Sequence, residues 1–530
     1  MLGLMQEQQL LISMLLKHAE RHHADTEIVS RRVEGDIHRY GYVDLARRSR
    51  QLANALDRAG LAESDRVASI AWNGYRHMEL YFGVSGSGRV MHTINPRMHP
   101  RQITWVINHA EDKVVCFDAT FLPIAQAVHA NCPTVKHWVL LCDADALPAD
   151  SGIPGLLSYE AWIGSEPEAY NWPQFDENTA AGLCYTSGTT GDPKGALYSH
   201  RSTLLHAYAG ALPDSIGLGA ADAMLPVVPM FHVNAWGLPY VAALVGCKVV
   251  FPGPAMDGKS IYELMEAEKV TFAAGVPTIW QMLLSHLQSN DLRFSTLQRT
   301  IVGGSALPES MQTTFKEEFG VAAIHAWGMT ETSPIGVVSK LLPKHADMPA
   351  EEVQKVKLKQ GRGVWGVDLK LIGSECRTHP WDGVSSGHLH VRGPWIASGY
   401  FRNEGGDVLD ADGFFPTGDV ATIDADGYLQ LVDRAKDVIK SGGEWISSID
   451  VENAAHSHPG VAQAAVIGVS HPKWQERPLM LVVRRQDSNV SKQDILDFLQ
   501  DRIAKWWLPD EIIFVDSLPY TATGKILKNK

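Results

Sequence analysis

The sequence predicts an α/β protein with a large N-terminal part and a small mobile C-terminal part. Apolar segments typical of buried strands alternate with helical segments over the first 360 residues, which favours doubly wound α/β subdomains. Apolar and polar residues then alternate between positions 361 and 433, as in antiparallel strands. The last part, 434–530, combines strand and helix patterns and predicts a compact α+β domain.

The first α/β subdomain is expected to span residues 1–175. An apolar stripe at 10–16 predicts an amphipathic helix that faces the core, with membrane contact as the alternative reading of the same stripe. A second helix is expected at 45–56. The expected buried strands of this subdomain are 66–72 and 114–117. Proline and acidic residues accumulate at 143–177, which indicates a surface excursion.

The remaining units follow in order: a second α/β subdomain at 176–360, a β-subdomain at 361–433 and the C-terminal domain at 434–530. Together the first three form a large domain, 1–433, and a hinge is expected near 433–436. Expected elements are a helix from His200, strands at 248–251, 271–274, 299–302, 464–469 and 479–483, and a helix at 491–505.

Composition excludes several classes of function. The formal net charge of −13 argues against a general nucleic-acid binder, which needs a basic surface. No run approaches ~18 apolar residues, so no integral membrane segment is expected. The N-terminus lacks the basic start of a signal peptide, and the six cysteines form no C-x-x-C pair. We expect a cytoplasmic protein with reduced cysteines.

The segment 185–195, Tyr-Thr-Ser-Gly-Thr-Thr-Gly-Asp-Pro-Lys-Gly, is the densest candidate site. It holds three glycines, four Ser/Thr hydroxyls and Lys194. Glycines let the backbone N–H groups approach an anion, and lysine supplies a point charge suited to phosphate. The spacing does not fit G-x-x-x-x-G-K-[ST], and such clusters are also found in plain turns. Polyphosphate binding and a structural turn both remain open on this segment alone.

Further candidates lie downstream. Glu331, beside Thr330, could bind Mg²⁺, and Trp327 could stack on a base or fill the core. Asp419 follows a Thr-Gly turn and could accept ribose hydroxyls or cap the turn. Near the C-terminus, Lys525 follows a glycine in what is either a catalytic segment or a mobile tail.

Taken in order, these motifs resemble the adenylate-forming superfamily, which comprises acyl-CoA synthetases, luciferases and peptide-synthetase adenylation domains. The segments 228–237, Val-Pro-Met-Phe-His-Val-Asn-Ala-Trp-Gly, and 441–447, Ser-Gly-Gly-Glu-Trp-Ile-Ser, are similar to fatty acyl-CoA synthetases. The segments 71–73, 92–97 and 197–202 are similar to bacterial medium-chain acyl-CoA ligases and 3-methylmercaptopropionyl-CoA ligases. The resemblance covers nearly the whole chain.

The resemblance implies contacts with ATP and Mg²⁺. The β- and γ-phosphates would be held by Thr186, Ser187, Gly188, Thr189, Thr190 and Lys194. Adenine would lie beside Gly304, Ser305, Ala306, His325, Ala326 and Trp327, and the ribose beside Asp419 and Arg434. Thr330 would contact the α-phosphate, Glu331 and Thr186 would bind Mg²⁺, and Lys525 would stabilise charge during adenylation.

The resemblance also implies sites for the acid and for CoA. His232, Val233, Asn234, Trp236 and Gly237 would line the acyl site, with His232 in a positioning role because a carboxylate needs no base at neutral pH. The small domain would rotate at Lys436, where many relatives carry aspartate, and bring Lys440, Gly442, Gly443, Glu444 and Trp445 to CoA. Relatives usually continue further beyond Lys525, so a shortened last helix is expected.

The implied function is an ATP-dependent acyl-CoA ligase. A medium-chain fatty acid, ATP and CoA would give acyl-CoA, AMP and pyrophosphate through an acyl-adenylate. One alternative is a 3-methylmercaptopropionate-CoA ligase, and another is an adenylating enzyme that loads a carrier protein. The expected partners are these small molecules, with a homodimer suggested by the resemblance.

Overall fold

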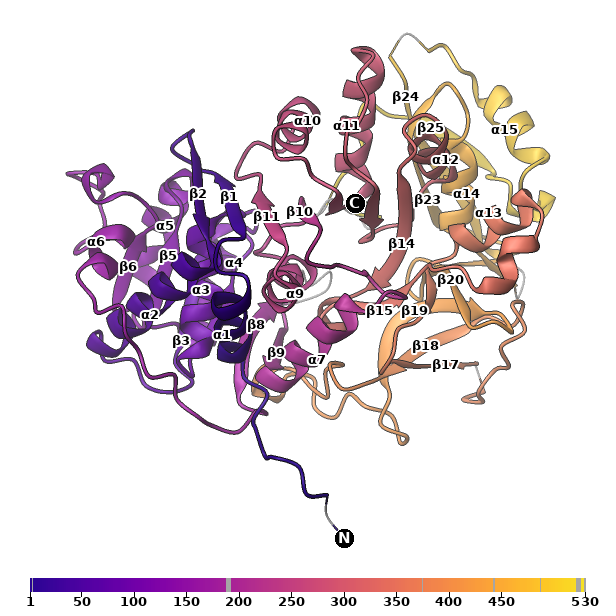
Figure 1. Ribbon diagram of the computed structural model, residues 1–530. Helices are drawn as coiled ribbons and strands as arrows, with labels where there is room; N and C mark the ends of the chain where they lie inside the picture. Colours follow the sequence, from indigo (N-terminus) through magenta and orange to yellow (C-terminus); the bar gives the residue numbers. More distant parts are fainter. Residues whose placement is uncertain are drawn as a thin grey trace.

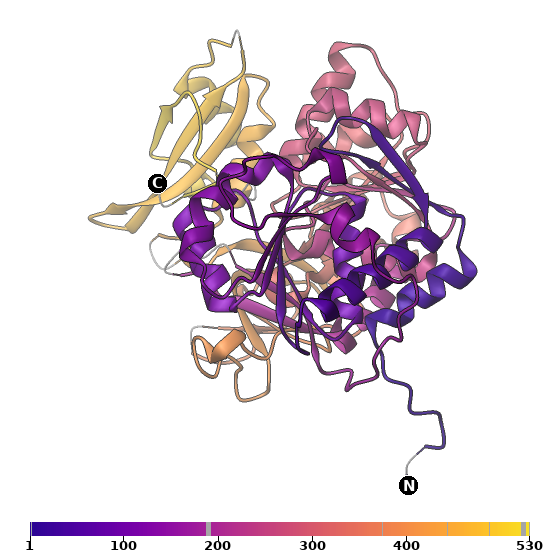
Figure 2. The same ribbon diagram turned by 90° about the vertical axis from the view of Figure 1, so that its left-hand side faces the viewer.

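The computed structural model describes residues 1, 3–186, 192–373, 375–441, 444–486, 488–520 and 526–528, without the side chains of Glu444 and Trp445. Two large sheets form the main body, and a smaller lobe contains the C-terminal residues (Figure 1). Figure 2 shows this lobe, in yellow, beside the main body. The predicted α/β class is confirmed.

The first sheet has seven strands. Their order is β7 (Leu157–Ser158), β6 (His137–Leu140), β5 (Val114–Phe117), β3 (Arg66–Ile70), β4 (Val90–Thr93), β8 (Ala180–Tyr185) and β9 (Gly195–Ser199). Only the β8–β9 pair is antiparallel. The inner strands read as continuous apolar runs because helices cover both faces of a parallel sheet.

The second sheet has thirteen strands. Their order is β17 (Asp368–Ile372), β18 (Gly387–Arg392), β19 (Phe415–Ile423), β20 (Tyr428–Arg434), β16 (Gly361–Gly363), β15 (Ile335–Val338), β14 (Ala322–Gly328), β13 (Arg299–Val302), β12 (Phe272–Gly275), β10 (Ala223–Pro226), β11 (Lys248–Phe251), β1 (Glu27–Arg31) and β2 (Ile37–Gly41). Pairing is parallel from β14 to β1 and antiparallel from β14 to β17. The predicted β-subdomain therefore continues the second α/β sheet.

The two sheets exchange strands across the boundary that the sequence places at residue 175. β1 and β2 come from the N-terminal part but pair with β11 in the second sheet. β8 and β9 come after residue 175 but pair with β4 in the first sheet. A boundary between residues 175 and 176 would therefore divide both sheets. Local periodicity in a sequence identifies strands, but it does not show which strands pair with each other.

Helices pack between and around the sheets. Their bounds are α1 (Ile12–His22), α2 (Tyr42–Arg58), α3 (Tyr75–Gly86), α4 (Pro100–Ala110), α5 (Leu122–Val128), α6 (Tyr159–Gly164), α7 (His200–Ala211), α8 (Val233–Trp236), α9 (Leu238–Val245), α10 (Gly258–Ala267), α11 (Pro277–Ser289), α12 (Glu309–Glu317) and α13 (Ala350–Leu358). Every residue of α3 is buried, so its polar side chains Arg76 and Glu79 are paired inside the protein. The stripe at 10–16 belongs to α1, whose Leu15 and Leu16 join the central core.

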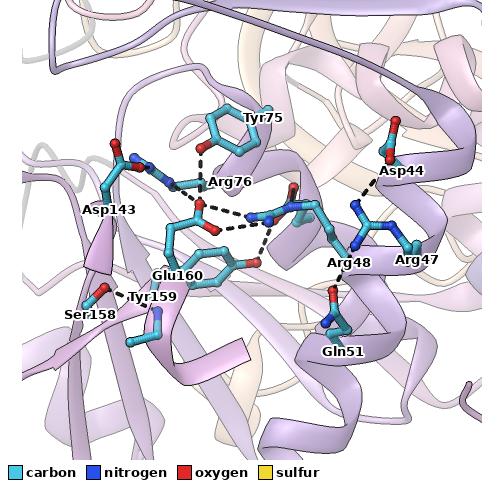
Figure 3. A network of polar contacts seen from close by, with 12 residues as sticks. Asp44, Arg47, Arg48, Gln51, Tyr75, Arg76, Asp143, Ser158, Tyr159 and Glu160 are labelled. Atoms are coloured by element: carbon cyan, nitrogen blue, oxygen red, sulfur yellow. Dashed lines mark hydrogen bonds and ion pairs between the residues drawn. The ribbon is translucent and has the colours of Figure 1, made fainter. Parts of the chain in front are cut away.

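The acidic region 143–177 contains more structure than the expected surface excursion. It precedes the glycine-rich segment 185–195, which we call the phosphate loop after its expected role. Figure 3 shows Glu160, on α6, inside a network of polar contacts with α2 and α3. Its carboxylate accepts hydrogen bonds from Arg48 at 3.0 Å and from Arg76 at 2.9 Å. Arg48 also pairs with the fully buried Glu79 at 2.7 Å. These ion pairs join three helices of the first α/β layer.

The C-terminal lobe has five strands and two α-helices among its described residues. The elements are β21 (Ile439–Ser441), β22 (Glu444–Ile446), α14 (Ser448–His456), β23 (Val461–His471), β24 (Gln475–Arg484), α15 (Lys492–Gln500) and β25 (Glu511–Phe514). The helix predicted at 491–505 is thus too long. The helix ends at Gln500, and further along the chain the carbonyl oxygen of Trp506 accepts from Arg477 at 2.8 Å, with Arg477 stacked on the Trp506 ring.

Candidate active site

A cavity of about 540 Å³ lies where the two sheets and the C-terminal lobe meet. It is lined by residues at the carboxyl ends of β10, β12, β13 and β14, together with Thr186, which directly follows β8. In open α/β sheets, ligands bind at the carboxyl ends of the strands. Location alone therefore makes this cavity the candidate site.

Most of the described candidate residues from the sequence line this cavity. They are Thr186, Lys194, His232, Val233, Trp236, Gly304, Ala326, Trp327, Thr330, Glu331, Arg434 and Lys436. The candidates outside the described residues are Ser187, Gly188, Thr189, Thr190, Gly442, Gly443 and Lys525, together with the side chains of Glu444 and Trp445. Segments separated by up to 250 positions thus contribute to one cavity, from Thr186 to Lys436.

The base of the phosphate loop is closed by two hydrogen bonds. The backbone N–H of Thr186 donates to the carbonyl oxygen of Lys194 at 2.8 Å, and the N–H of Lys194 donates to Thr186 Oγ1 at 3.2 Å. Tyr185 and Gly195 pair across the β8–β9 ladder. The chain thus leaves and re-enters this segment at paired positions of two antiparallel strands, and the Lys194 ammonium lies over the Tyr400 ring at 5.0 Å.

The turn that carries Thr330 and Glu331 is held from two sides. The Tyr198 hydroxyl donates to the carbonyl oxygen of Thr330 at 2.7 Å. The backbone N–H of Ala397 donates to the carbonyl oxygen of Glu331 at 2.8 Å. The Tyr400 hydroxyl donates to Glu331 Oε1 at 2.6 Å. The sequence analysis missed Tyr198 and Tyr400, since no local motif indicates contacts over 132 and 69 positions.

Asp419 lies behind the cavity wall in contact with two other candidates. Its Oδ2 accepts from Trp327 Nε1 at 2.9 Å, and its Oδ1 pairs with Arg434 Nε at 2.9 Å. Trp327 is mostly buried and packs in the β-subdomain core, so it serves both as a core residue and as cavity lining. The carboxylate thus fixes both neighbours, and both of these line the cavity.

His325 supports the cavity wall from behind and does not line it. Its Nε2 accepts from the N–H of Leu307 at 3.3 Å, and its Nδ1 lies 3.0 Å from the carbonyl oxygen of Leu358. Burial lowers the pKa of His325 to about 4, so the ring is neutral. Ser305 and Ala306 are also absent from the lining, whereas the neighbouring Gly303 and Gly304 are part of it.

The segment that follows His232 forms a left-handed turn of four residues, Val233–Trp236. Their φ angles lie between 46° and 59°, which costs about 1–2 kcal/mol per residue for L-amino acids. Such strain persists only where the surroundings enforce it and is concentrated at functional sites. The turn aims Trp236 at the cavity, beside Gly303.

Asn234 and Gly237 hold this turn from outside the cavity. Asn234 Oδ1 accepts from the Tyr81 hydroxyl at 3.3 Å and lies 3.4 Å from Cys184 Sγ. A Cβ at Gly237 would lie 2.7 Å from the His206 ring, and its φ is 73°. Both predicted acyl-site residues therefore act on the turn and do not line the cavity.

Beyond the turn, the cavity wall is apolar. Its members include Ile216, Val227, Val228, Phe231, Met256, Val276, Ile279, Ile301, Ile335, Val337 and Val338. The lining also includes the polar residues Thr186, Lys194, Thr330, Glu331 and Arg434. The cavity therefore suits a ligand with an apolar part and an anionic part.

The C-terminal segment reaches the same cavity. Ile526, Leu527 and Lys528 line it, directly after the undescribed Lys525. Lys440 lies elsewhere, with an exposed side chain on β21 and its N–H donating to Glu476 Oε2 at 2.8 Å. The two candidate catalytic lysines are therefore carried by different parts of the lobe.

The cavity residues fit a nucleotide with a magnesium ion. The backbone at Gly303 packs closely against the protein itself, since a Cβ there would lie 3.1 Å from the Ala326 carbonyl oxygen and 3.2 Å from the Trp236 ring. Among the described residues, no three His, Cys, Asp or Glu side chains are grouped to hold a metal ion on their own. Mg²⁺ is commonly held by one or two carboxylates together with substrate phosphates, and Glu331 supplies such a carboxylate.

Comparison with known proteins decides the family. The model of the AMP-binding enzymes matches residues 15–401, and that of the AMP-binding enzyme C-terminal domain matches residues 450–525. The chain belongs to the AMP-binding enzyme family. In the described part of this AMP-binding enzyme, no helix has both the length and the apolar character needed to cross a membrane.

Two relatives and one solved structure illustrate the likeness of this AMP-binding enzyme to others. The 3-methylmercaptopropionyl-CoA ligase of Ruegeria lacuscaerulensis is 50% identical over 100% of this chain and 98% of its own length. The medium-chain-fatty-acid–CoA ligase of Ectopseudomonas oleovorans is 50% identical over 100% and 97%. The anthranilate CoA ligase AuaEII, solved with anthranoyl-AMP, superposes with a TM-score of 0.85 at 25% identity, covering 97% of this chain and 95% of that one.

Proposed function

We propose that this protein is an ATP-dependent acyl-CoA ligase for an aliphatic acid of medium chain length. The substrate carboxylate attacks the α-phosphorus of ATP, and pyrophosphate leaves to give the acyl-adenylate. The thiol of CoA then attacks the acyl carbon, AMP leaves, and the thiol proton passes to solvent. The relatives named for such ligases match this chain over its whole length.

One observation carries the proposal: the cavity is lined both by apolar side chains and by charged ones. Val227, Ile279 and Ile301 represent the apolar wall, and Lys194 and Glu331 represent the polar side. An acyl chain in the apolar part would place its carboxylate toward the nucleotide phosphates. Such positioning accounts for a large part of the rate in reactions between two bound substrates.

The chain's own residues have distinct tasks in adenylation. Lys194 supplies positive charge for the phosphates of ATP, and the turn at Thr330 presents a hydroxyl and the Glu331 carboxylate. Mg²⁺, bound with the nucleotide at Glu331, would neutralise charge on the phosphates and on the leaving pyrophosphate. Asp419 and Arg434, which form an ion pair with each other, would bind the ribose.

His232 acts by position in this proposal, because the acid substrate is already ionised at neutral pH. Lys525 would act at the α-phosphate, since the residues after it line the cavity. A rotation at Lys436 would then withdraw this segment and bring the β21 face with Lys440 to CoA. Both lysines would thus serve different half-reactions.

Substrate length is tested by a rate series with straight-chain acids from three to sixteen carbons, with 3-methylmercaptopropionate as an added member. We expect the rate of acyl-CoA formation to be highest for acids of medium length, because the apolar wall includes eleven or more side chains that can contact the acyl chain. A maximum at the short thioether acid would replace the medium-chain proposal by the thioether alternative. A maximum at ten or more carbons would exclude that alternative.

A further inference from the structure

The surface segment 400–405, which we call the strap, lies against the outgoing end of the phosphate loop. The Lys194 ammonium lies 5.0 Å from the centre of the Tyr400 ring. A Cβ added to Gly405 would lie 3.1 Å from Lys194 Nζ, so the lysine also contacts the strap backbone. Phe401 packs on Gly195, where an added Cβ would lie 3.1 Å from Phe401 Cβ.

The strap also contacts the incoming end of the loop through His109. The Tyr185 hydroxyl lies 2.6 Å from His109 Nδ1, and His109 Nε2 lies 3.3 Å from a Glu404 carboxylate oxygen. A phenol that donates to Nδ1 leaves the ring proton on Nε2, where it faces Glu404. The strap therefore holds residues on both sides of the phosphate loop.

Tyr400 joins this strap to the metal-site candidate. Its hydroxyl donates to Glu331 Oε1 at 2.6 Å while its ring lies below Lys194. A carboxylate only accepts hydrogen bonds, so the Tyr400 hydroxyl is the donor in this contact. Both Tyr400 and Glu331 line the cavity. One side chain thus contacts both charges that would face the β- and γ-phosphates.

We propose that Tyr400 is a positioning residue for the magnesium–pyrophosphate part of the site. Its hydroxyl orients the Glu331 carboxylate toward a magnesium ion, and its ring orients the Lys194 ammonium toward the phosphates. The inference rests on the proposed function, because it assigns Glu331 to the metal and Lys194 to ATP. Loss of a hydrogen-bond partner that orients a metal-binding carboxylate commonly weakens metal binding by about 10–100-fold.

Two variants separate the hydroxyl from the ring. Tyr400→Phe removes the hydrogen bond to Glu331 and keeps the ring below Lys194, whereas Tyr400→Leu removes both. Mn²⁺ is titrated by electron paramagnetic resonance into the full-length protein with α,β-methylene-ATP, which is not cleaved at the α-phosphate. We expect Mn²⁺ to bind about tenfold more weakly to Tyr400→Phe than to wild type.

The ring is tested by calorimetric binding of the same nucleotide in EDTA, where no metal contributes. Tyr400→Phe should bind like wild type, and Tyr400→Leu about threefold or more weakly, as expected when a cation–π contact is lost. Tyr208→Phe, at an exposed tyrosine on α7, is the matched control and should change neither value. Melting temperatures check that each variant is folded.

Unchanged Mn²⁺ affinity in folded Tyr400→Phe would overturn the inference, as would a lower melting temperature with no change in metal binding. In turnover, the Mg²⁺ concentration for half-maximal pyrophosphate exchange should rise about tenfold in Tyr400→Phe, with KM for the acid unchanged. The binding measurements need no turnover. If the wild-type protein formed no acyl-adenylate, that result would contradict the proposed function. The metal-binding result would still test the role of Tyr400.

Discussion

Lys528 Nζ lies 2.8 Å from Glu452 Oε1, in a mostly buried ion pair that fastens the C-terminal segment to α14. Glu452 Oε1 also accepts from the N–H of Val466 at 2.7 Å, so the carboxylate is fixed to the sheet of the lobe. Lys528 in addition contacts Ser448 Oγ at the start of α14. The anchor lies three positions after Lys525.

Lys528→Met should therefore slow adenylation by about tenfold or more, because breaking one side of a buried ion pair costs about 3–5 kcal/mol and would release the segment that carries Lys525. The rate at which a supplied acyl-adenylate is converted to the thioester should change by less than about twofold. Lys528→Arg, which keeps the charge, is the control. Equal loss in both half-reactions would contradict a role specific to adenylation. Rapid-quench assays of each half-reaction measure the difference.

Lys525→Ala tests the lysine itself. If Lys525 stabilises charge at the α-phosphate, its removal should lower the adenylation rate by about 100-fold, the size of effect seen when one preorganised donor is removed. Thioester formation from supplied acyl-adenylate should persist, since the proposed rotation withdraws this lysine. Lys440→Ala should give the reverse pattern. If each variant lost the same fraction of its rate in both half-reactions, the two lysines would not serve separate half-reactions.

His200 makes stability depend on pH. Its Nδ1 accepts from the N–H of Ile12 at 3.1 Å, which joins the N-terminal ends of α1 and α7, and burial lowers the pKa of His200 to about 3. Because the unfolded chain has the ordinary pKa near 6.5, it binds the proton first, and stability falls as pH drops below 6.5. Between pH 6.5 and 5 the loss should be about 2 kcal/mol from this group.

His200→Gln should reduce that slope while lowering stability at pH 7.5 by about 1 kcal/mol, as expected for an altered hydrogen bond. Urea unfolding at several pH values between 5 and 7.5 measures both effects. Substitution of the partly exposed His129 is the matched control and should leave the slope unchanged. A variant with the wild-type slope would show that other groups carry the acid sensitivity.

The sequence predicts local features of this protein better than distant contacts. Lys194, Thr330 and Glu331 were predicted because each stands in a short motif whose chemistry is local, and all three line the cavity. Tyr400 was missed because its contact with Glu331 depends on how the β-subdomain folds back across the site. Likewise, β1 and β2 were not predicted as strands, and their place in the second sheet depends on pairing with the distant β11.

Trp236→Ala should change chain-length preference more than KM for ATP. The indole lies on the strained turn, faces the cavity and approaches Gly303, so its removal adds space between the apolar wall and the adenine-side backbone. Longer acids should gain in kcat/KM relative to octanoate by about fivefold, since added apolar burial is worth about 0.8 kcal/mol per methylene group. Trp365→Ala, at an exposed tryptophan, is the control and should preserve the profile. A raised KM for ATP with an unchanged length profile would place Trp236 with the nucleotide, because the acyl chain would then not contact the indole.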